Sequence, residues 1–191
     1  MNIAYYIRQL LALIEPEGDD REGLNGTPTR VERAYKEWFS GYDQDPADLF
    51  KTFDDGAEKY DEMVLQSGCP LYSTCEHHMA PFFGFVHFGY IPNGRIIGLS
   101  KMLRLVDAFA RRLTVQERIT TQLADCIEEH LQPLGVGVVI QARHLCIESR
   151  GIGKPGSITT TSALRGAMKD NQGARAEFLD FARSSAALYR P

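Results

Sequence analysis

Hydrophobic side chains recur every three or four residues in the first part of the chain, which is the spacing of one face of an α-helix. Pro16 ends the first such stretch, and Thr27 followed by Pro28 is typical of an N-cap and first helical turn. Three helical stretches are predicted here: residues 3–14, residues 27–39 and a short helix near 46–51. An acidic connection over residues 43–61 completes this N-terminal helical segment.

From Met63 the hydrophobic period changes to two, which predicts β-strands. Between residues 82 and 91 both sets of alternating positions are largely apolar, so we expect this strand to be covered on both faces. Further strands are predicted over residues 95–99, 135–147 and 157–162. Helices are predicted from a Ser100 cap to Arg112, from a Thr114 cap to about Leu131, and over residues 174–187.

The elements follow the order helices, hairpin, two helices, second hairpin and final helix. This order is typical of an α+β fold built on an antiparallel sheet. We expect an N-terminal helical segment over residues 1–62 and a sheet-containing domain over residues 63–191.

The composition fits one compact domain rather than a disordered, fibrous or membrane-spanning chain. Of the 191 residues, 43% are hydrophobic and 24% are charged, which is enough apolar surface for a core without disulfides. The longest apolar stretches, 82–91 and 136–140, are too short or too interrupted to span a bilayer. The N-terminus lacks the basic region and cleavage site of a signal peptide, so we expect a cytoplasmic protein.

Charge is distributed unevenly along the chain. Residues 1–62 carry seven basic and fifteen acidic side chains, whereas residues 95–154 carry nine basic and six acidic ones. The net charge of −4 argues against a nonspecific nucleic-acid binder. The basic middle suits a small polyanion such as a nucleoside triphosphate, although a solvated acidic N-terminal surface without functional meaning explains the charge equally well.

Four cysteines are present: Cys69, Cys75, Cys126 and Cys146. Without a signal peptide, reduced thiols or metal ligands are favoured over disulfides. Cys126 shares a predicted helix face with Ile119, Leu123 and Ile127, so we interpret it as a core thiol.

Cys75 and His78 put a thiol and an imidazole three residues apart at a predicted strand end. Such a pair can bind one Zn²⁺, but two ligands alone are weak evidence. His144 and Cys146 strengthen the case, because strand alternation is expected to direct both side chains to one face. Cys75, His78 and Cys146 together would leave a fourth position for water, as in catalytic zinc sites.

The same residues allow alternatives. Cys69 as a fourth ligand would close the site into a structural Cys₃His centre. His77 or His144 alone would normally be interpreted as a partly buried structural histidine, but beside metal-ligand spacing both are candidates for proton transfer. His87, isolated on its strand, is interpreted as structural.

Several motifs, in their order and spacing, resemble those of GTP cyclohydrolase I. They are REGLNGTPTRVERAY, FSGYDQDP, CEHHMAPFFG, GYIP, IIGLSK, ARRLTVQERIT and ARHLCIESRG followed by IGKPGSITTTS. The similarity runs from Arg21 to Leu179. It implies the tunnelling fold, in which an antiparallel sheet and two long helices per subunit form a barrel, with residues 63–191 as the catalytic domain. It also implies a homodecamer of two stacked pentamers with active sites at subunit junctions.

The resemblance also implies roles for individual residues. Cys75, His78 and Cys146 match the ligands of one Zn²⁺ per subunit, and His77 and His144 match proton-transfer histidines. Glu117 matches the carboxylate that holds guanine, with Gln116 beside it. The residues matched to the ribose and triphosphate are Ser100, Lys101, Arg104 and Arg150, and we expect Arg30 and Arg33 to add to the same basic pocket. Ser100 is also a candidate to assist the later catalytic steps.

The implied reaction converts GTP and water to 7,8-dihydroneopterin triphosphate and formate, the first step of pterin and tetrahydrofolate, or of 7-deazaguanine, biosynthesis. Two other classes of protein make different demands. A noncatalytic zinc-stabilised nucleotide-binding module would have four protein ligands, including Cys69. A sister fold that reduces a nitrile on a 7-deazaguanine would need a nucleophilic cysteine and a nicotinamide cofactor, whereas the two Cys–His pairs favour a metal.

Overall fold

The computed structural model describes residues 2–15, 21–53 and 57–186. The chain divides into two compact units, Met1–Ser40 and Gly41–Pro191. Residues 41–62 therefore group with the second unit by packing. The sequence predicts that the catalytic domain begins at residue 63, and this boundary stays a prediction.

The first unit is helical, as the sequence predicts. It contains α1 (Ile3–Ile14), α2 (Glu22–Asn25) and α3 (Thr27–Trp38). The Asn2 side chain caps α1 by accepting a hydrogen bond from the Tyr5 N–H (3.1 Å). Thr27 is not the N-cap of α3, because Gly26 occupies that position and Thr27 lies in the first turn beside Pro28. Pro16, the expected end of the first helix, lies outside the described residues.

The second unit is built on a five-stranded sheet in the order β5-β2-β3-β6-β7. Its strands are β2 (Val64–Cys75), β3 (Pro81–Ile91), β5 (Leu113–Thr114), β6 (Gly135–His144) and β7 (Ile158–Gly166). All pairs are antiparallel except the short parallel contact of β5 with β2. The α+β class and the antiparallel sheet predicted from the sequence are confirmed.

The remaining short elements lie around the sheet. The predicted return strand after residue 94 is only β4 (Ile96–Ile97), and it pairs with β1 (Thr52–Phe53) rather than with β3. The 3-10 helices are η1 (Ser40–Asp43), η2 (Pro46–Leu49) and η3 (Ala57–Lys59). The short helix expected near residues 46–51 is therefore present as a 3-10 turn.

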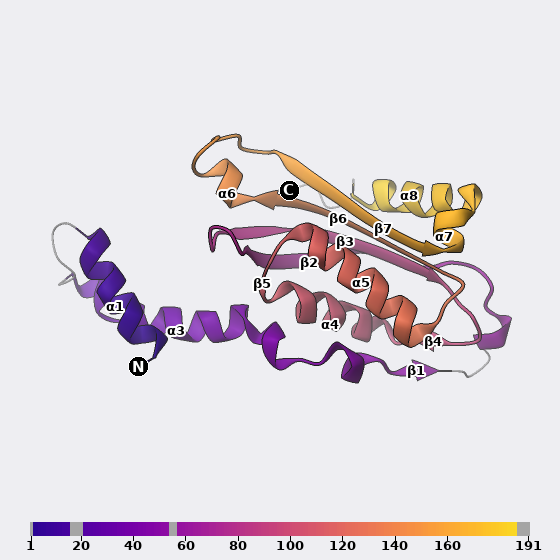
Figure 1. Cartoon of the computed structure of the whole chain (residues 1–191), viewed down its shortest axis with the longest axis horizontal. Helices are drawn as coiled ribbons and strands as arrows, with labels where there is room; N and C mark the ends of the chain where they lie inside the picture. The colour runs from indigo at the N-terminus through magenta and orange to yellow at the C-terminus, as the bar shows by residue number, and fades with distance from the viewer. Residues whose placement is uncertain (1, 16–20, 54–56, 187–191) are drawn as a thin grey trace. The chain divides into compact units, whose positions relative to one another are not determined.

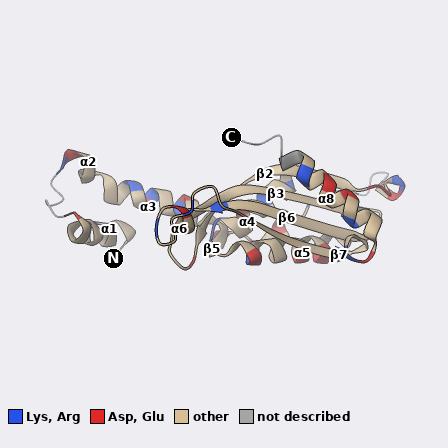
Figure 2. Cartoon of the chain, turned by 90° about the horizontal axis from the view of Figure 1, so that it is seen from above, with Lys and Arg blue, Asp and Glu red and all other residues tan. Residues whose placement is uncertain are grey.

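Two long helices, α4 (Leu99–Ala110) and α5 (Gln116–Leu131), cover one face of the sheet (Figure 1). Alternate residues of β3 and β6 are directed into the main core there: Phe82, Val86, Phe88, Tyr90, Val136, Val138, Ile140 and Ala142. α7 (Ala167–Asp170) and α8 (Gln172–Ala186) pack on the other face around Phe178 and Met168. The strands carry few charges, which gather on the helices and loops (Figure 2).

Helix caps differ from the sequence prediction. Gly98 precedes α4 and Val115 precedes α5, so neither Ser100 nor Thr114 is a cap. Thr114 instead ends β5, beside Cys75 of β2. The last helix begins earlier than predicted, at Gln172, and its expected end at residue 187 lies outside the described residues.

The two residues interpreted as structural are both buried. Cys126 belongs to the main core, and burial raises the pKa of its thiol to about 11. His87 is fully buried on β3, where its Nδ1 accepts a hydrogen bond from the Gly68 N–H (3.3 Å), and burial lowers its pKa. Across the described residues, no helix combines the length and apolarity needed to cross a bilayer.

Candidate metal centre and active site

Cys75 ends β2 and starts the tight loop that carries His77 and His78. The Cys75 N–H donates to the Ala80 carbonyl oxygen (2.9 Å), and the Met79 N–H donates to the Cys75 carbonyl oxygen (2.8 Å). Met79 has φ 52°, a left-handed conformation that costs a non-glycine residue roughly 1–2 kcal/mol. The loop turns so tightly that the Nδ1 atoms of His77 and His78 both lie 3.9 Å from the Cys75 sulfur.

Cys146 lies on α6 (Leu145–Glu148), a single helical turn, and not on the strand that the sequence predicts. The alternation argument for His144 and Cys146 is therefore wrong, because β6 ends at His144 and the chain then turns. The turn still brings Cys146 to the loop after β2. The ligand atoms of Cys75, His78 and Cys146 all lie within 4.8 Å of one another.

An ion pair between a half-exposed guanidinium and a buried carboxylate holds α6 in place. The Arg143 guanidinium donates to both carboxylate oxygens of Glu148, from Nε at 2.9 Å and from Nη2 at 2.5 Å. This two-bonded pair keeps the pKa of Glu148 below its usual range. Because Glu148 ends the turn that carries Cys146, the pair fixes the position of one candidate ligand.

Cys69 is far from this group. It precedes Cys75 by six residues on the same extended strand, which separates the two by about 20 Å. Its side chain is 3% exposed, and burial raises the pKa of its thiol to about 11. In the part of the chain that the structure describes, no further cysteine, histidine or carboxylate joins the three-residue group. The structure thus gives no support to a four-ligand centre that includes Cys69.

The donor set suits a zinc ion. Two thiols and one imidazole are ligands that Zn²⁺ prefers, whereas Mg²⁺ and Ca²⁺ select oxygen ligands. Burial raises the pKa of Cys146, the adjacent Cys75 thiol raises it further, and Arg150 opposes both. Thiols give up their protons when they bind a metal ion, so the proximity of Cys146 to Cys75 and His78 suits a site that forms together with its metal.

His144 lies at the same end of the sheet. Its ring stacks on Phe82 (centroids 4.7 Å apart, 8° between planes), and its Nε2 lies 2.9 Å from the Gln116 side-chain oxygen. Burial lowers the pKa of His144, and the charges of Glu117 and Glu148 oppose this shift. His77, in contrast, is exposed.

The first turn of α5 is attached to the ligand loop. The Glu76 N–H donates to the Thr114 carbonyl oxygen (3.1 Å), and the Arg118 guanidinium donates to both Glu76 carboxylate oxygens (2.5 and 3.1 Å). Glu117 is exposed in this turn, whereas Gln116 is buried. The sequence analysis assigns no role to Glu76 or Arg118, although Glu76 lies inside the CEHH motif.

The residues expected around the phosphates are divided between two places. Arg150 follows α6 and lies close enough to Cys146 to lower its pKa. Ser100, Lys101 and Arg104 lie in the first turns of α4, whose last residue, Ala110, accepts a hydrogen bond from Ser73 near the end of β2 (2.6 Å). Ser100 is thus about 15 Å along the helix from Ala110, towards the opposite end of the sheet. Within one chain these three residues are not brought to the Cys–His–Cys group.

Arg30 and Arg33 lie on α3 in the first unit. The Arg30 guanidinium donates to the Gly23 carbonyl oxygen (2.6 Å) and to the Thr27 hydroxyl (3.1 Å). Their contribution to a phosphate pocket stays a prediction.

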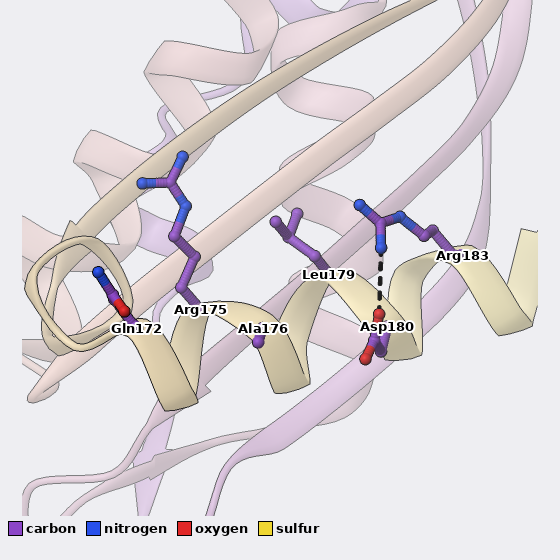
Figure 3. A pocket seen from close by; sticks show the side chains of 6 residues that line it. All are labelled: Gln172, Arg175, Ala176, Leu179, Asp180 and Arg183. Atoms are coloured by element: carbon purple, nitrogen blue, oxygen red, sulfur yellow. Dashed lines mark hydrogen bonds and ion pairs between the residues drawn. The ribbon is translucent and has the colours of Figure 1, made fainter.

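A hollow of about 250 Å³ lies on α8, but it contains none of the expected site residues (Figure 3). It is lined by Gln172, Arg175, Ala176, Leu179, Asp180 and Arg183. Asp180 pairs with Arg183 (3.1 Å) across its rim. The candidate metal ligands Cys75, His78 and Cys146 gather instead with His144 where β2 and β6 end.

Comparison with known proteins gives a consistent match along the chain. The family model described as GTP cyclohydrolase I matches residues 3–183. A GTP cyclohydrolase 1 from Janthinobacterium sp. (strain Marseille) is 62% identical over 87% of this chain and 84% of its own length. Relatives of the same name from Nitrosospira multiformis and Mycolicibacterium vanbaalenii are 54% and 53% identical, over 90% and 91% of this chain and 91% and 86% of their own lengths.

Proposed function

The chain belongs to the GTP cyclohydrolase I family of hydrolases, and from this premise we propose that it is a zinc-dependent enzyme converting GTP and water to 7,8-dihydroneopterin triphosphate and formate. The observation that carries the proposal is the group formed by Cys75, His78 and Cys146, whose ligand atoms lie within 4.8 Å of one another. A noncatalytic module with four protein ligands would need Cys69, which lies about six strand residues away from Cys75.

Cys75, His78 and Cys146 would hold the zinc ion, one per subunit. When bound, Zn²⁺ acts as a Lewis acid and supplies activated water at neutral pH, as hydrolysis of the guanine imidazole ring requires. The chain contributes the shape of this site through two attachments. Glu148 fixes the turn that carries Cys146, and Glu76 fixes the Cys75–His78 loop against α5.

Glu117 is the residue we assign to guanine recognition. Its carboxylate is exposed in the first turn of α5, beside the loop that carries the zinc ligands. A carboxylate only accepts hydrogen bonds, and guanine offers it two adjacent donors, N1–H and the exocyclic amine. Holding the base by this edge directs the opposite, imidazole edge of the purine away from Glu117.

His77 and His144 are assigned to proton transfer. Opening the imidazole ring at C8 requires a proton at N7, and histidine is the side chain suited to donating one near neutral pH. His77 is exposed beside Cys75, and His144 is held by Phe82 and Gln116 at the end of β6. Ser100 is proposed to assist the later steps, in which the ribose is rearranged and reclosed.

The triphosphate is assigned to Lys101, Arg104 and Arg150, with Arg30 and Arg33 as further contacts. Guanidinium groups bind phosphate oxygens through two parallel hydrogen bonds. Because Lys101 and Arg104 lie on the part of α4 distant from the Cys–His–Cys group, one chain does not supply the whole pocket. We therefore propose that a second copy of the chain brings its Ser100, Lys101 and Arg104 to the zinc site of the first.

The sheet has features that favour such self-association. In the described residues no strand pairs with the outer edge of β7, and β5 covers the other edge with only two residues. On the same sheet Tyr72 and Ile158 are 70% and 62% exposed. Unpaired edges and open apolar positions are satisfied when sheets of several subunits join. We propose a homo-oligomer, and the family resemblance favours a decamer of two pentamers.

Incubation of the purified protein with GTP and zinc tests the proposed reaction. Formate and the fluorescent oxidised pterin should appear in equal amounts, and removal of zinc with a chelator should stop both. Cys146→Ser serves as a matched inactive protein, because it removes one ligand from an otherwise intact chain. A zinc-loaded wild-type protein that binds GTP but releases no formate would contradict the proposal.

The cellular setting is inferred from chemistry. All four cysteines are free thiols, which suits a reducing compartment, and we propose a cytoplasmic location. The product has the skeleton required for pterins and tetrahydrofolate or for 7-deazaguanines, so we place the enzyme at the first step of such a route.

A further inference from the structure

The Gln116 side chain lies in a buried hydrogen-bond network beside His144. It is 1% exposed, at the first position of α5, and lies between this helix and the strands β6 and β7. Its amide nitrogen lies 3.1 Å from the carbonyl oxygens of both Ile140 and Thr159, and 3.0 Å from the Thr161 hydroxyl. The sequence resemblance places this residue beside guanine, but its amide nitrogen is directed into the protein.

These contacts fix which way the amide group points. Carbonyl oxygens only accept hydrogen bonds, so the atom facing Ile140 and Thr159 must be the NH₂ group. Turning the amide over would place its oxygen, which cannot donate, against two carbonyl oxygens. The Gln116 oxygen is therefore held towards His144, 2.9 Å from Nε2.

The orientation of Gln116 in turn determines where the proton sits on His144. An amide oxygen only accepts, so the His144 Nε2 must carry the hydrogen. In the neutral imidazole the lone pair is then on Nδ1, which becomes the nitrogen available for proton exchange. Phe82 stacks in parallel on the ring at 4.7 Å, which restricts rotation out of this plane.

From this geometry we propose that Gln116 is a positioning residue for His144, which holds the ring in its Nε2–H tautomer and presents Nδ1 to the substrate. The effect on proton transfer rests on the proposed function, whereas the tautomer of His144 rests only on the hydrogen bonds of Gln116. Gln116 thus acts on proton transfer through His144 and not by contact of its side chain with guanine.

The surrounding hydroxyls make Gln116 part of a buried network. Thr120 Oγ1 lies 2.8 Å from the Gln116 backbone carbonyl oxygen and 2.6 Å from Thr161 Oγ1. Gln116 contacts His144 directly, whereas Thr161 is connected to His144 only through its hydrogen bond with Gln116. Thr161→Val removes a single acceptor and leaves Gln116 its two carbonyl partners, which makes it a matched control for general disturbance of the network.

The tautomer is measured directly by ¹⁵N magic-angle-spinning NMR of full-length protein labelled on its five histidines, with His144 assigned by its loss in His144→Ala. We expect His144 to be a single Nε2–H tautomer in the wild type and in Thr161→Val, and a mixture in Gln116→Met. A wild-type His144 protonated on Nδ1 would overturn the proposal without any variant. So would an unchanged spectrum in a folded Gln116→Met protein.

Kinetics separate a positioning role from a guanine contact. For Gln116→Met we expect kcat with GTP to fall by roughly 10²-fold while KM changes little, because general acid–base catalysis contributes about this much. In a His144→Ala background the same change should cost less than about threefold, since both act through one group. A raised KM with unchanged kcat would assign Gln116 to guanine instead. So would a double variant whose loss of activity equals the product of the losses in Gln116→Met and His144→Ala. Wild-type protein that releases no formate would refute the proposed function, whereas the NMR result would still decide the tautomer.

Discussion

Among the four cysteines, position and not residue type decides which are suited to metal binding. Cys69 and Cys126 are buried in the apolar core, where burial raises the pKa of each thiol to about 11. Such thiols stay protonated near neutral pH and are poor ligands. Cys75 is buried in the same core, but it lies at the end of the sheet, where it meets Cys146 and His78.

Single substitutions of these cysteines test that distinction. Cys75→Ser and Cys146→Ser should lose stoichiometric zinc and formate release, whereas Cys69→Ser should keep both because Cys69 takes no part in the group. The zinc content of each variant after gel filtration decides between a three-ligand centre and a four-ligand centre that includes Cys69. Loss of zinc from a folded Cys69→Ser protein would show that the four-ligand centre is correct.

The second prediction at residue scale concerns Glu117. If its carboxylate holds guanine, Glu117→Gln should keep the fold and the zinc but lower GTP turnover by orders of magnitude, since sites built on such paired donors discriminate by roughly 10⁴. If Glu117 only favours the helix dipole, the change should cost about 0.3–1 kcal/mol of stability and leave turnover intact.

Glu129→Gln is the matched control for Glu117, because Glu129 is also exposed on α5 but lies near the other end of the helix. Formate release and thermal unfolding of both variants are measured together. Wild-type turnover by Glu117→Gln would remove Glu117 from guanine recognition.

At the scale of elements, α6 shows how a short turn can carry a functional side chain. Four residues are too few for a stable helix by propensity alone, so α6 depends on tertiary contacts. α6 packs against β3, and the Arg143–Glu148 pair, whose Glu148 side chain is only 5% exposed, closes the turn across its two ends. Strand alternation predicted from the sequence could not reveal this turn, because it is set by a pair that forms only in the folded chain.

Weakening this pair should reduce metal affinity. Glu148→Gln retains the shape of the side chain but replaces the carboxylate that both Arg143 bonds require. We expect zinc affinity to fall by about 10–100-fold, the usual effect of disturbing groups that orient metal ligands. Competition with a chromophoric chelator measures it.

Asp125→Asn provides the comparison, since Asp125 pairs with Arg165 (2.7 Å) on the exposed side of α5, away from α6. Its zinc affinity should equal that of the wild type. Equal affinities for all three proteins would mean that α6 holds Cys146 without the ion pair.

For the whole molecule, the decisive feature is the distribution of the expected site over two ends of the sheet. Cys75, His78, Cys146 and His144 gather where β2 and β6 end, while Ser100, Lys101 and Arg104 begin α4 at a distance. Under the proposed function, a chain arranged in this way would complete its site by contact with another copy. Rotational assembly through a heterologous interface would provide that contact for every subunit.

Mixed oligomers test the shared site. Cys146→Ser and Arg104→Ala should each be inactive alone, but co-expression with two different tags and purification by both should restore activity. In a ring with randomly mixed subunits, roughly a quarter of the sites would combine the zinc ligands of an Arg104→Ala subunit with the phosphate-binding residues of a Cys146→Ser subunit. Light scattering checks the assembly of each protein. Failure of the mixed, assembled protein to regain any activity would place the whole site within one chain.

The sequence by itself determined the fold class and the family, and it predicted a metal site. Apolar periodicity identified the helix over residues 3–14 and the strands around residues 82–91 and 135–147, since these patterns depend only on local geometry. The ligand types at residues 75, 78 and 146 indicated a metal group, and the structure brings them together.

Only the tertiary structure decided which partners these elements take. It paired β4 with β1, turned residues 145–148 into a helix, and directed the Gln116 amide into the protein. It also separated Ser100, Lys101 and Arg104 from the metal group. The reason is physical: periodicity reports which face of an element is apolar, whereas hydrogen-bond partners and ion pairs join residues distant in sequence and exist only after the chain has folded.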